Sequence, residues 1–237
     1  DPDGNNTTAG TTYSSLQGTL AYPFADPNYA MRWIDGVVGT NNPVNADEWT
    51  IVVYPGAYTI GDVNITTINE LSIHLMNGAD ITYNGSTRWI DMAGTGNGNV
   101  SQLTISGDLN NNSNYTPNIN MTGGGTVVDL ASGKLVMNNL NIVGNSEIVE
   151  VTGSGDAFIS NCNLENTGGV AIAISNGIQS LISIKDSTII GNGSAVITTG
   201  NGTGTATPNI LILDNSTIIM DDAGDIITAA SGGANNG

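Results

Sequence analysis

Three acidic residues have the type and spacing of catalytic carboxylates. Each lies between two apolar residues, as IDM at 90–92, VDL at 128–130 and VEV at 149–151. Alternate side chains of a β-strand face opposite sides, so inward apolar neighbours would turn Asp91, Asp129 and Glu150 outward together. On neighbouring strands these carboxylates, called the carboxylate ladder below, would lie about 5 to 10 Å apart and raise one another's pKa. Glycoside hydrolysis uses such a pair, one group as general acid and the other as base or nucleophile.

The same residues have two other interpretations. An alternating strand must place polar groups on its outer face, so a solvated acidic surface is the simplest of them. Calcium binding is the second, and residues 221–225 form another acidic turn, although neither set matches an EF-hand loop or the calcium-binding nonapeptide. The only cations near the ladder in the sequence are Arg88 and Lys134. We therefore expect no metal site and no cofactor, keep calcium as an alternative, and lean against enzymatic activity.

The composition limits the partners. The 237 residues include 21 Asp plus Glu but only 4 Lys plus Arg, which gives a formal net charge of -17. A field this negative repels nucleic acid, which we exclude as a partner. No stretch of about 18 apolar residues is present, so no membrane insertion is expected. The one cysteine, Cys162, excludes an internal disulfide framework.

The elements that would position the ladder come from an internal repeat. Four segments alternate apolar and other residues up to a polar fifth position: LVMNNLNI at 135–142, AFISNCNL at 157–164, ISIKDSTI at 182–189 and LILDNSTI at 211–218. The fifth residues are Asn139, Asn161, Asp186 and Asn215, separated by 22, 25 and 29 residues. Such residues tolerate a left-handed bend, and their side chains can hydrogen-bond from one repeat to the next. We expect a structural ladder of these four, with Asn215 inaccessible inside it.

Each repeat continues into a second apolar strand. These strands are expected at 127–130, 148–151, 170–174, 195–199 and 225–228, separated by Gly- and Asn-rich turns with no helix between them. A period of 20 to 30 residues without helices does not suit a βαβ sheet. It favours an all-β parallel solenoid over residues 47–230, with equivalent strands stacked at about 4.8 Å.

Residues 1–46 differ from the rest of the chain. Asp26 followed by Pro27 predicts a helix start, and Ala30, Ile34 and Val37 share one helical face over residues 27–38. We expect this short amphipathic helix to cap the open end of the solenoid. The Gly/Asn-rich tail at 231–237 has no capping pattern, so we expect the chain to continue there into another domain or against another subunit.

One segment resembles a known family. The run TIVVYPGAYTIGDVNI at 50–65, preceded by a short helix and followed by Asn-containing repeats, resembles the opening of right-handed parallel β-helix proteins of the pectin-lyase-like superfamily. The composition, with few charged residues and many asparagines, is most similar to that of phage or virus tail-fibre and tailspike β-helices. The resemblance covers roughly residues 13–230. It implies a single-stranded right-handed β-helix, a fold that carries lyases, hydrolases, adhesins and inert fibres.

Two further sets of residues bear on partners. Tyr83, Trp89 and Tyr115 are candidates for stacking on sugar rings, although packing beneath the cap and the first coils is the alternative for the tryptophans. His74 is expected to be a surface or hydrogen-bonded residue rather than a metal ligand. Of eleven Asn-x-Ser/Thr sequons, the most accessible glycosylation sites are expected in the long turns, at Asn111, Asn114, Asn192 and Asn201.

These patterns favour a structural and adhesive function. We expect a module of an extracellular or virion fibre that self-associates as a homo-oligomer and binds surface polysaccharide. A polysaccharide-degrading enzyme that uses the carboxylate ladder is the first alternative. A subunit of a cell-surface filament is the second, because it shares every sequence feature with the fibre.

Overall fold

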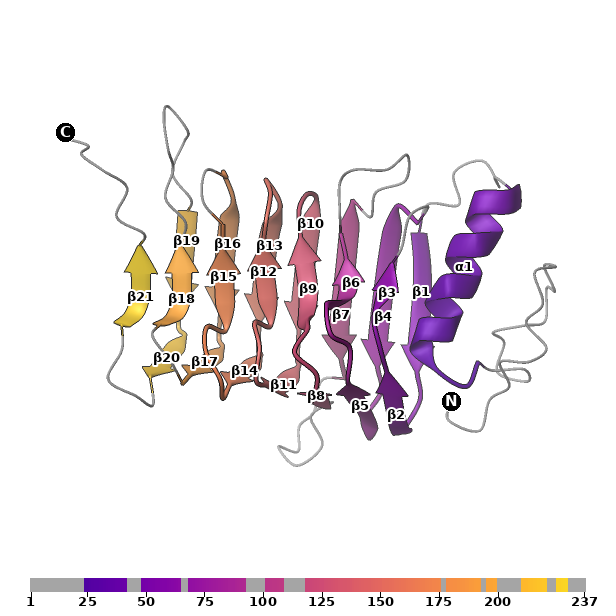
Figure 1. The fold of residues 1–237 in the computed structure, drawn as a ribbon, viewed down its shortest axis with the longest axis horizontal. Coiled ribbons are helices and arrows are strands. Elements are labelled where there is room, and N and C mark those ends of the chain that lie inside the picture. Colours follow the sequence, from indigo (N-terminus) through magenta and orange to yellow (C-terminus); the bar gives the residue numbers. More distant parts are fainter. Residues whose placement is uncertain are drawn as a thin grey trace.

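The computed structural model describes residues 24–41, 48–64, 68–92, 101–108, 118–175, 178–192, 195–199, 210–220 and 225–229. Within them, three seven-stranded parallel sheets run along the long axis of an elongated stack (Figure 1). The chain visits the first, second and third sheet in turn and then repeats this order. One such set of three strands is called a rung below. The prediction of an all-β parallel solenoid is confirmed.

Every rung contributes one strand to each sheet, so the strands of a sheet follow one another along the stack in sequence order. The first sheet contains β1 (Glu48–Val53), β4 (Glu70–Leu75), β7 (Gln102–Gly107), β10 (Lys134–Asn138), β13 (Asp156–Ser160), β16 (Leu181–Lys185) and β19 (Ile210–Asp214). The second contains β2 (Gly56–Ile60), β5 (Ala79–Tyr83), β8 (Asn118–Met121), β11 (Asn141–Gly144), β14 (Asn163–Asn166), β17 (Thr188–Gly191) and β20 (Thr217–Met220). The third contains β3 (Val63–Asn64), β6 (Arg88–Asp91), β9 (Thr126–Leu130), β12 (Val149–Val151), β15 (Ile172–Ile174), β18 (Ala195–Thr199) and β21 (Asp225–Ala229).

Alternation along the strands builds one continuous core. In β4 and β7 every second residue is buried, and the residues between them face outward. The parallel register then places residues of the same type next to each other on neighbouring rungs. Leu71, Leu103 and Leu135 lie in one such row and are at most 1% exposed. Each fully buried side chain of this kind contributes about 1.5 to 3 kcal/mol of transfer free energy. The row is the physical reason why the sequence repeats its apolar positions.

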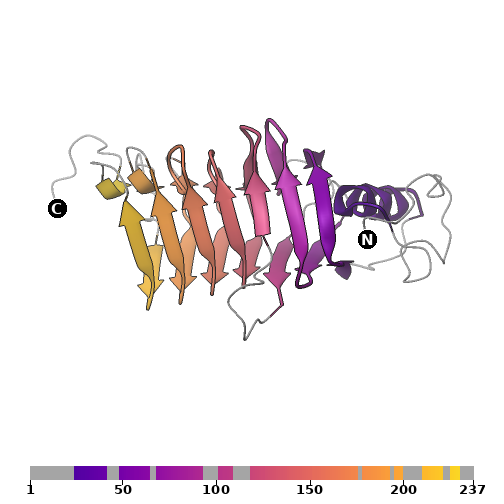
Figure 2. The same cartoon turned by 90° about the horizontal axis from the view of Figure 1, so that it is seen from below.

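The helix α1 (Pro27–Asn41) covers one end of this core, as Figures 1 and 2 show. It begins at the predicted residue, and the Tyr29 N–H donates to Asp26 Oδ1 at 2.6 Å, which is the hydrogen bond of an N-cap. It ends at Asn41 rather than at residue 38. Met31 and Ile34 are buried in the core, at most 5% exposed. No helix in the described residues has the length and apolar character needed to cross a membrane.

A short hydrogen-bond chain joins α1 to the first rungs. Asn28 is 3% exposed, and its Nδ2 donates to the Gly61 carbonyl at 2.5 Å. Its Oδ1 accepts the indole N–H of the fully buried Trp89 at 2.7 Å. Both polar ends of the carboxamide are therefore satisfied inside an apolar environment. The contact fixes the position of the helix on the end of the stack.

The three repeat asparagines and the repeat aspartate lie at the corner between the first and second sheets. Their φ angles are 57°, 51°, 48° and 46°, all in the left-handed region, for Asn139, Asn161, Asp186 and Asn215. Backbone bonds connect the corners: the Asn139, Asn161 and Asp186 N–H groups donate to carbonyls of the next rung at 3.0–3.1 Å. Asn215 Nδ2 donates to Asp186 Oδ1 at 2.6 Å.

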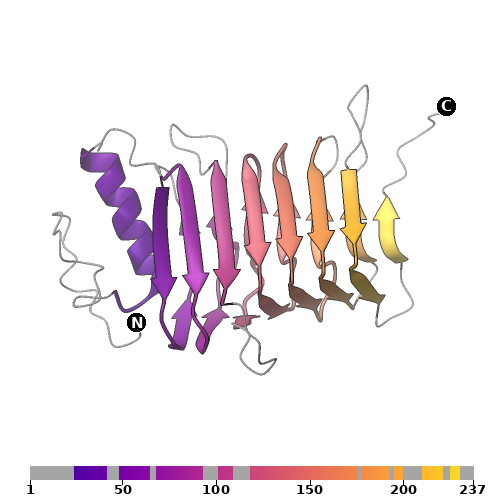
Figure 3. The ribbon, with the colours of Figure 1, turned by 180° about the vertical axis from the view of Figure 1, so that it is seen from behind.

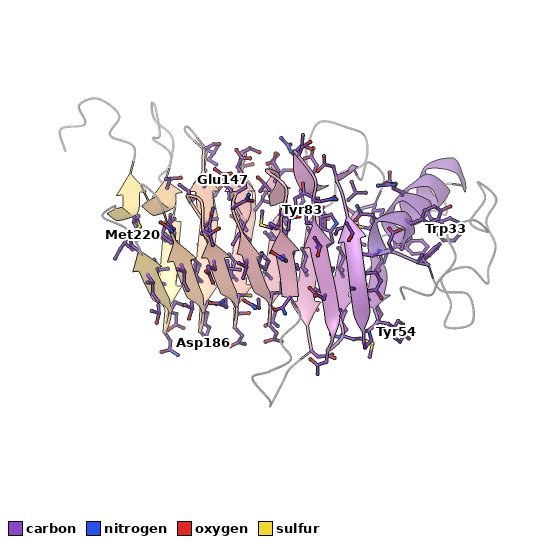
Figure 4. All side chains as sticks on the ribbon, turned by 60° about the horizontal axis from the view of Figure 1, so that its bottom comes forward. Trp33, Tyr54, Tyr83, Glu147, Asp186 and Met220 are labelled. Atoms are coloured by element: carbon purple, nitrogen blue, oxygen red, sulfur yellow. The ribbon has the colours of Figure 1, made fainter. Side chains whose placement is uncertain are left out.

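The prediction that Asn215 is inaccessible is wrong. Asn215, Asn161 and Asp186 are all exposed, because a left-handed corner turns its side chain away from the core. Figure 4 shows Asp186 at the outer edge of the stack. The row of asparagine carboxamides lies two residues further on, where Asn163 Nδ2 donates to Asn141 Oδ1 at 2.9 Å. Asn141 Nδ2 in turn donates to Asn118 Oδ1 at 2.7 Å.

The backbone angle at Asn161 leads to a prediction. Asn161→Val is expected to lower the free energy of unfolding by about 1 to 2 kcal/mol, because a β-branched residue clashes in the left-handed region. Asn161→Gly is expected to stay within about 0.5 kcal/mol of the wild type, since glycine adopts this angle freely. Urea unfolding of the two variants measures the difference. Equal losses in both would show that the amide, and not the backbone angle, matters.

Candidate functional site

The carboxylate ladder forms on the third sheet. The register pairs Asp91 with Asp129 and Asp129 with Glu150, on three consecutive rungs. The pairing holds across the 38-residue separation between Asp91 and Asp129. Apolar neighbours of each residue are buried, for example Val149 and Val151 on either side of Glu150. The three carboxylates therefore share one face, as the alternation of the sequence indicates.

One arginine holds two members of the ladder. Arg88 Nη1 forms an ion pair with Asp129 Oδ2 and a second, at 3.2 Å, with Asp91 Oδ2. The other oxygen of Asp129, Oδ1, accepts the Thr152 hydroxyl at 2.5 Å. Asp129 is only 2% exposed, although its strand position faces outward. Both of its oxygens are engaged and shielded, so Asp129 cannot reach a substrate in this arrangement.

Glu150 differs from Asp129 in its surroundings. It is half-buried, and this burial raises the pKa of its carboxyl above the usual range. The negative charges of Asp129 and Glu147 raise the pKa further, while Arg88 partly opposes them. A carboxyl with a raised pKa suits a general acid. Its neighbour in the ladder is the buried Asp129, however, and Asp91, Asp129 and Arg88 together have the character of a structural ion-pair network.

The raised pKa of Glu150 predicts how stability changes with pH. A carboxyl whose folded pKa exceeds its unfolded pKa contributes stability that is present at low pH and is lost as the pH rises through the folded pKa. Glu150→Gln stays uncharged throughout. We expect it to match the wild type near about pH 3 and to be more stable near about pH 7. Thermal unfolding across this range tests it, and lower stability of Glu150→Gln at neutral pH would contradict it.

Two of the three expected sugar-stacking residues are not on the surface. Tyr83 and Trp89 are both 0% exposed, since they occupy inward positions of β5 and β6. The Tyr83 hydroxyl donates to Asp62 Oδ1 at 2.6 Å, and burial together with this carboxylate raises the pKa of the phenol. Figure 4 shows Tyr83 within the body of the stack. Tyr83 and Trp89 therefore belong to the core, and Tyr115 lies outside the described residues.

Most of the expected glycosylation sites are also outside the described residues. These are Asn111, Asn114 and Asn201. Asn192 is half-buried, and its backbone N–H donates to the Asn166 carbonyl at 3.0 Å. The acidic turn at 221–224 is likewise not described. Among the residues that the structure describes, no group of three or more His, Cys, Asp or Glu side chains is placed to hold a metal ion.

Sequence reasoning missed two residues that the structure brings to His74. Ser106 and Asp108 lie in the next rung and hydrogen-bond to its two ring nitrogens. Their separation from His74, 32 and 34 residues, hides the relation in the sequence. The signal that points to them is the outward alternation of Ser106 in β7.

Comparison of the chain with protein-family models, with curated proteins and with solved structures gives no match in any of the three.

Proposed function

We propose that this protein is a structural β-solenoid module of an extracellular or virion fibre, which associates end to end with a second copy. The supporting observation is the last rung, formed by β19, β20 and β21. Exposed large aliphatic side chains gather there: Ile210, Ile212, Leu213, Ile219, Ile226 and Ile227, which are 39% to 54% exposed. The only other exposed large hydrophobic residue among those described is Val52.

The inward positions of Leu213 and Ile227 show why the last rung is exposed. Leu213 pairs with Ile184 and Ile227 pairs with Ile197, and both partners, one rung earlier, are 0% exposed. The same positions on the last rung are 42% and 41% exposed. Among the residues that the structure describes, no further rung lies above them. This end of the stack thus combines an apolar surface with unpaired strand edges, a combination that favours association.

The opposite end offers a less suitable surface for head-to-tail stacking. There α1 covers the end of the stack (Figure 3), and its residues Met31 and Ile34 are buried in the core. The proposed contact therefore joins the same end of the two copies and is two-fold and self-complementary. The resemblance of residues 50–65 to pectin-lyase-like β-helices supports the finer proposal that the fibre is of the tail-fibre or tailspike type. The engagement and shielding of Asp129, the central carboxylate of the ladder, favour this structural function over polysaccharide hydrolysis.

Analytical ultracentrifugation over a range of protein concentrations tests the proposal. We expect a concentration-dependent dimer in the wild type and a monomer in the Leu213→Asp/Ile227→Asp variant. Val52→Asp is the matched control, because Val52 is 43% exposed but lies on the first rung. It is expected to dimerise like the wild type. A wild type that stays monomeric, or a control that dissociates as readily as the double variant, would refute end-to-end association.

A further inference from the structure

A set of reactive side chains lies on the outer face of the first sheet, remote from the carboxylate ladder on the third. Ser106 Oγ lies 3.0 Å from His74 Nδ1, and His74 Nε2 lies 2.9 Å from Asp108 Oδ1. His74 is in β4, Ser106 is in β7, and Asp108 follows β7 directly. The side chains of His74 and Asp108 are 36% and 32% exposed, so solvent and small molecules reach the imidazole.

The hydrogen bonds determine where the protons lie. Asp108 Oδ2 accepts the Asn77 N–H at 2.9 Å, and this bond, together with the one from His74, lowers the pKa of the Asp108 carboxyl. An ionised carboxylate only accepts, so His74 Nε2 must carry a hydrogen. Nδ1 of the neutral imidazole then holds a lone pair, and the Ser106 hydroxyl donates to it. This is the proton arrangement of a serine activated by histidine and aspartate, with the two ring nitrogens exchanged.

The register supplies neighbours on both sides of this group. Val52, His74, Ser106 and Asn138 lie side by side on four consecutive rungs, spaced at about 4.8 Å. Val52 is 43% exposed and offers an apolar surface next to His74. Asn138 Oδ1 accepts the Ser160 hydroxyl at 3.3 Å, which leaves its Nδ2 hydrogens to donate elsewhere. From one rung to the next, the row therefore presents an apolar contact (Val52), a base (His74), a hydroxyl (Ser106) and an amide donor (Asn138).

We propose that Ser106 is a nucleophile and His74 its general base in the hydrolysis of small, neutral acyl esters. The ester lies along the row with its carbonyl carbon over Ser106 and its carbonyl oxygen towards Asn138 Nδ2. Its leaving oxygen is at His74 and its alkyl group on Val52. An amide donor placed at the developing oxyanion is the expected source of stabilisation. The substrate is uncharged because the net charge of -17 repels carboxylates.

The reaction has two balanced steps. In the first, Ser106 Oγ bonds to the carbonyl carbon and its proton moves to His74 Nδ1. The bond from that carbon to the leaving oxygen breaks, and His74 returns the proton to the alkoxide, which departs as an alcohol. In the second, water attacks the acyl-serine and gives a proton to His74. The carbon–Oγ bond breaks, Ser106 regains the proton, and a carboxylic acid leaves. Asp108 is a positioning residue that holds Nε2 and keeps the tautomer.

Hydrolysis of p-nitrophenyl acetate by the full chain, followed by release of p-nitrophenolate, tests the proposal. Ser106→Ala is expected to lower kcat/KM at least about 100-fold. Ser72→Ala is the matched control, since Ser72 faces outward from the same strand as His74, and it is expected to retain wild-type turnover. Asp108→Asn is expected to lower kcat while KM stays unchanged, a split that a purely structural role would not produce.

A second readout locates the nucleophile in the wild-type protein itself. A fluorophosphonate probe should label the wild-type protein at Ser106, as located by peptide mass spectrometry, and should fail to label a His74→Gln variant. Labelling and turnover that both require Ser106 and His74 would support the proposal. Equal turnover by Ser106→Ala and the wild type would overturn it, because a surface imidazole would then act alone. The absence of both turnover and labelling in the wild-type protein would also overturn it.

Discussion

Replacing Arg88 with methionine is expected to lower the free energy of unfolding by about 3 kcal/mol or more. The substitution keeps the apolar stem but removes the guanidinium that forms ion pairs with Asp129 and Asp91. Asp129 is 2% exposed, so its charge would then lie in a shielded site with only the Thr152 hydroxyl as a partner. An unpaired buried charge costs far more than a lost surface ion pair.

Urea denaturation of Arg88→Met measures this loss. Arg32→Met is the matched control, since Arg32 is exposed and its Nη2 donates to the Asp62 carbonyl at 3.5 Å. A change within about 0.5 kcal/mol is expected there. The loss at Arg88 should also shrink when Asp129 is replaced by asparagine, because the charge that needs pairing is gone. Equal stabilities for the Arg88 and Arg32 variants would show that Asp129 is solvated.

Removing the carboxamide of Asn28 is expected to lower the free energy of unfolding by about 2 to 5 kcal/mol. Asn28→Ala leaves the buried Trp89 indole N–H and the carbonyl of the half-buried Gly61 without their partners, and an orphaned buried group costs about 1 to 3 kcal/mol. The variant also loosens the connection of α1 to the stack. The fluorescence of the tryptophans and the thermal unfolding midpoint report the two effects together.

Two comparisons make the Asn28 prediction specific. Asn145→Ala removes an exposed asparagine and is expected to change stability by no more than about 0.5 kcal/mol. A double-mutant cycle of Asn28→Ala with Trp89→Phe isolates the bond between the two side chains, because phenylalanine has no donor. A coupling energy near zero would show that Asn28 stabilises the protein through Gly61 alone.

The repeat in the sequence predicts most of the fold. The eight-residue pattern whose fifth positions are Asn139, Asn161, Asp186 and Asn215 places two strands and a left-handed corner, because only a few residue types tolerate that corner. Alternation also places the carboxylate ladder on one face of consecutive rungs. Both properties are local, since each follows from neighbours within one strand or turn.

The features that the sequence alone does not predict depend on how strands pair between rungs. Trp89 and Ile90 are consecutive and both buried, so the strict alternation of a strand does not hold there. Asp129 occupies an outward position, yet the contacts with Arg88 and Thr152 come from the rungs on either side and shield it. The approach of Ser106 to His74 likewise depends on the register of β4 with β7, which no local pattern contains.

The two ends of the stack differ, since α1 covers one end and the rung of β19, β20 and β21 is exposed at the other. The free energy of local opening therefore differs between the two ends. Each rung touches only its neighbours, so the molecule approximates a one-dimensional array whose stability is a sum of rung and interface terms. Opening an inner rung breaks two interfaces, whereas opening the rung of β19, β20 and β21 breaks one. Among the described rungs, local opening is therefore expected to begin at that rung and to advance towards α1, with backbone amide protection rising along the same axis. A partner that covers the last rung would raise protection most where it is lowest.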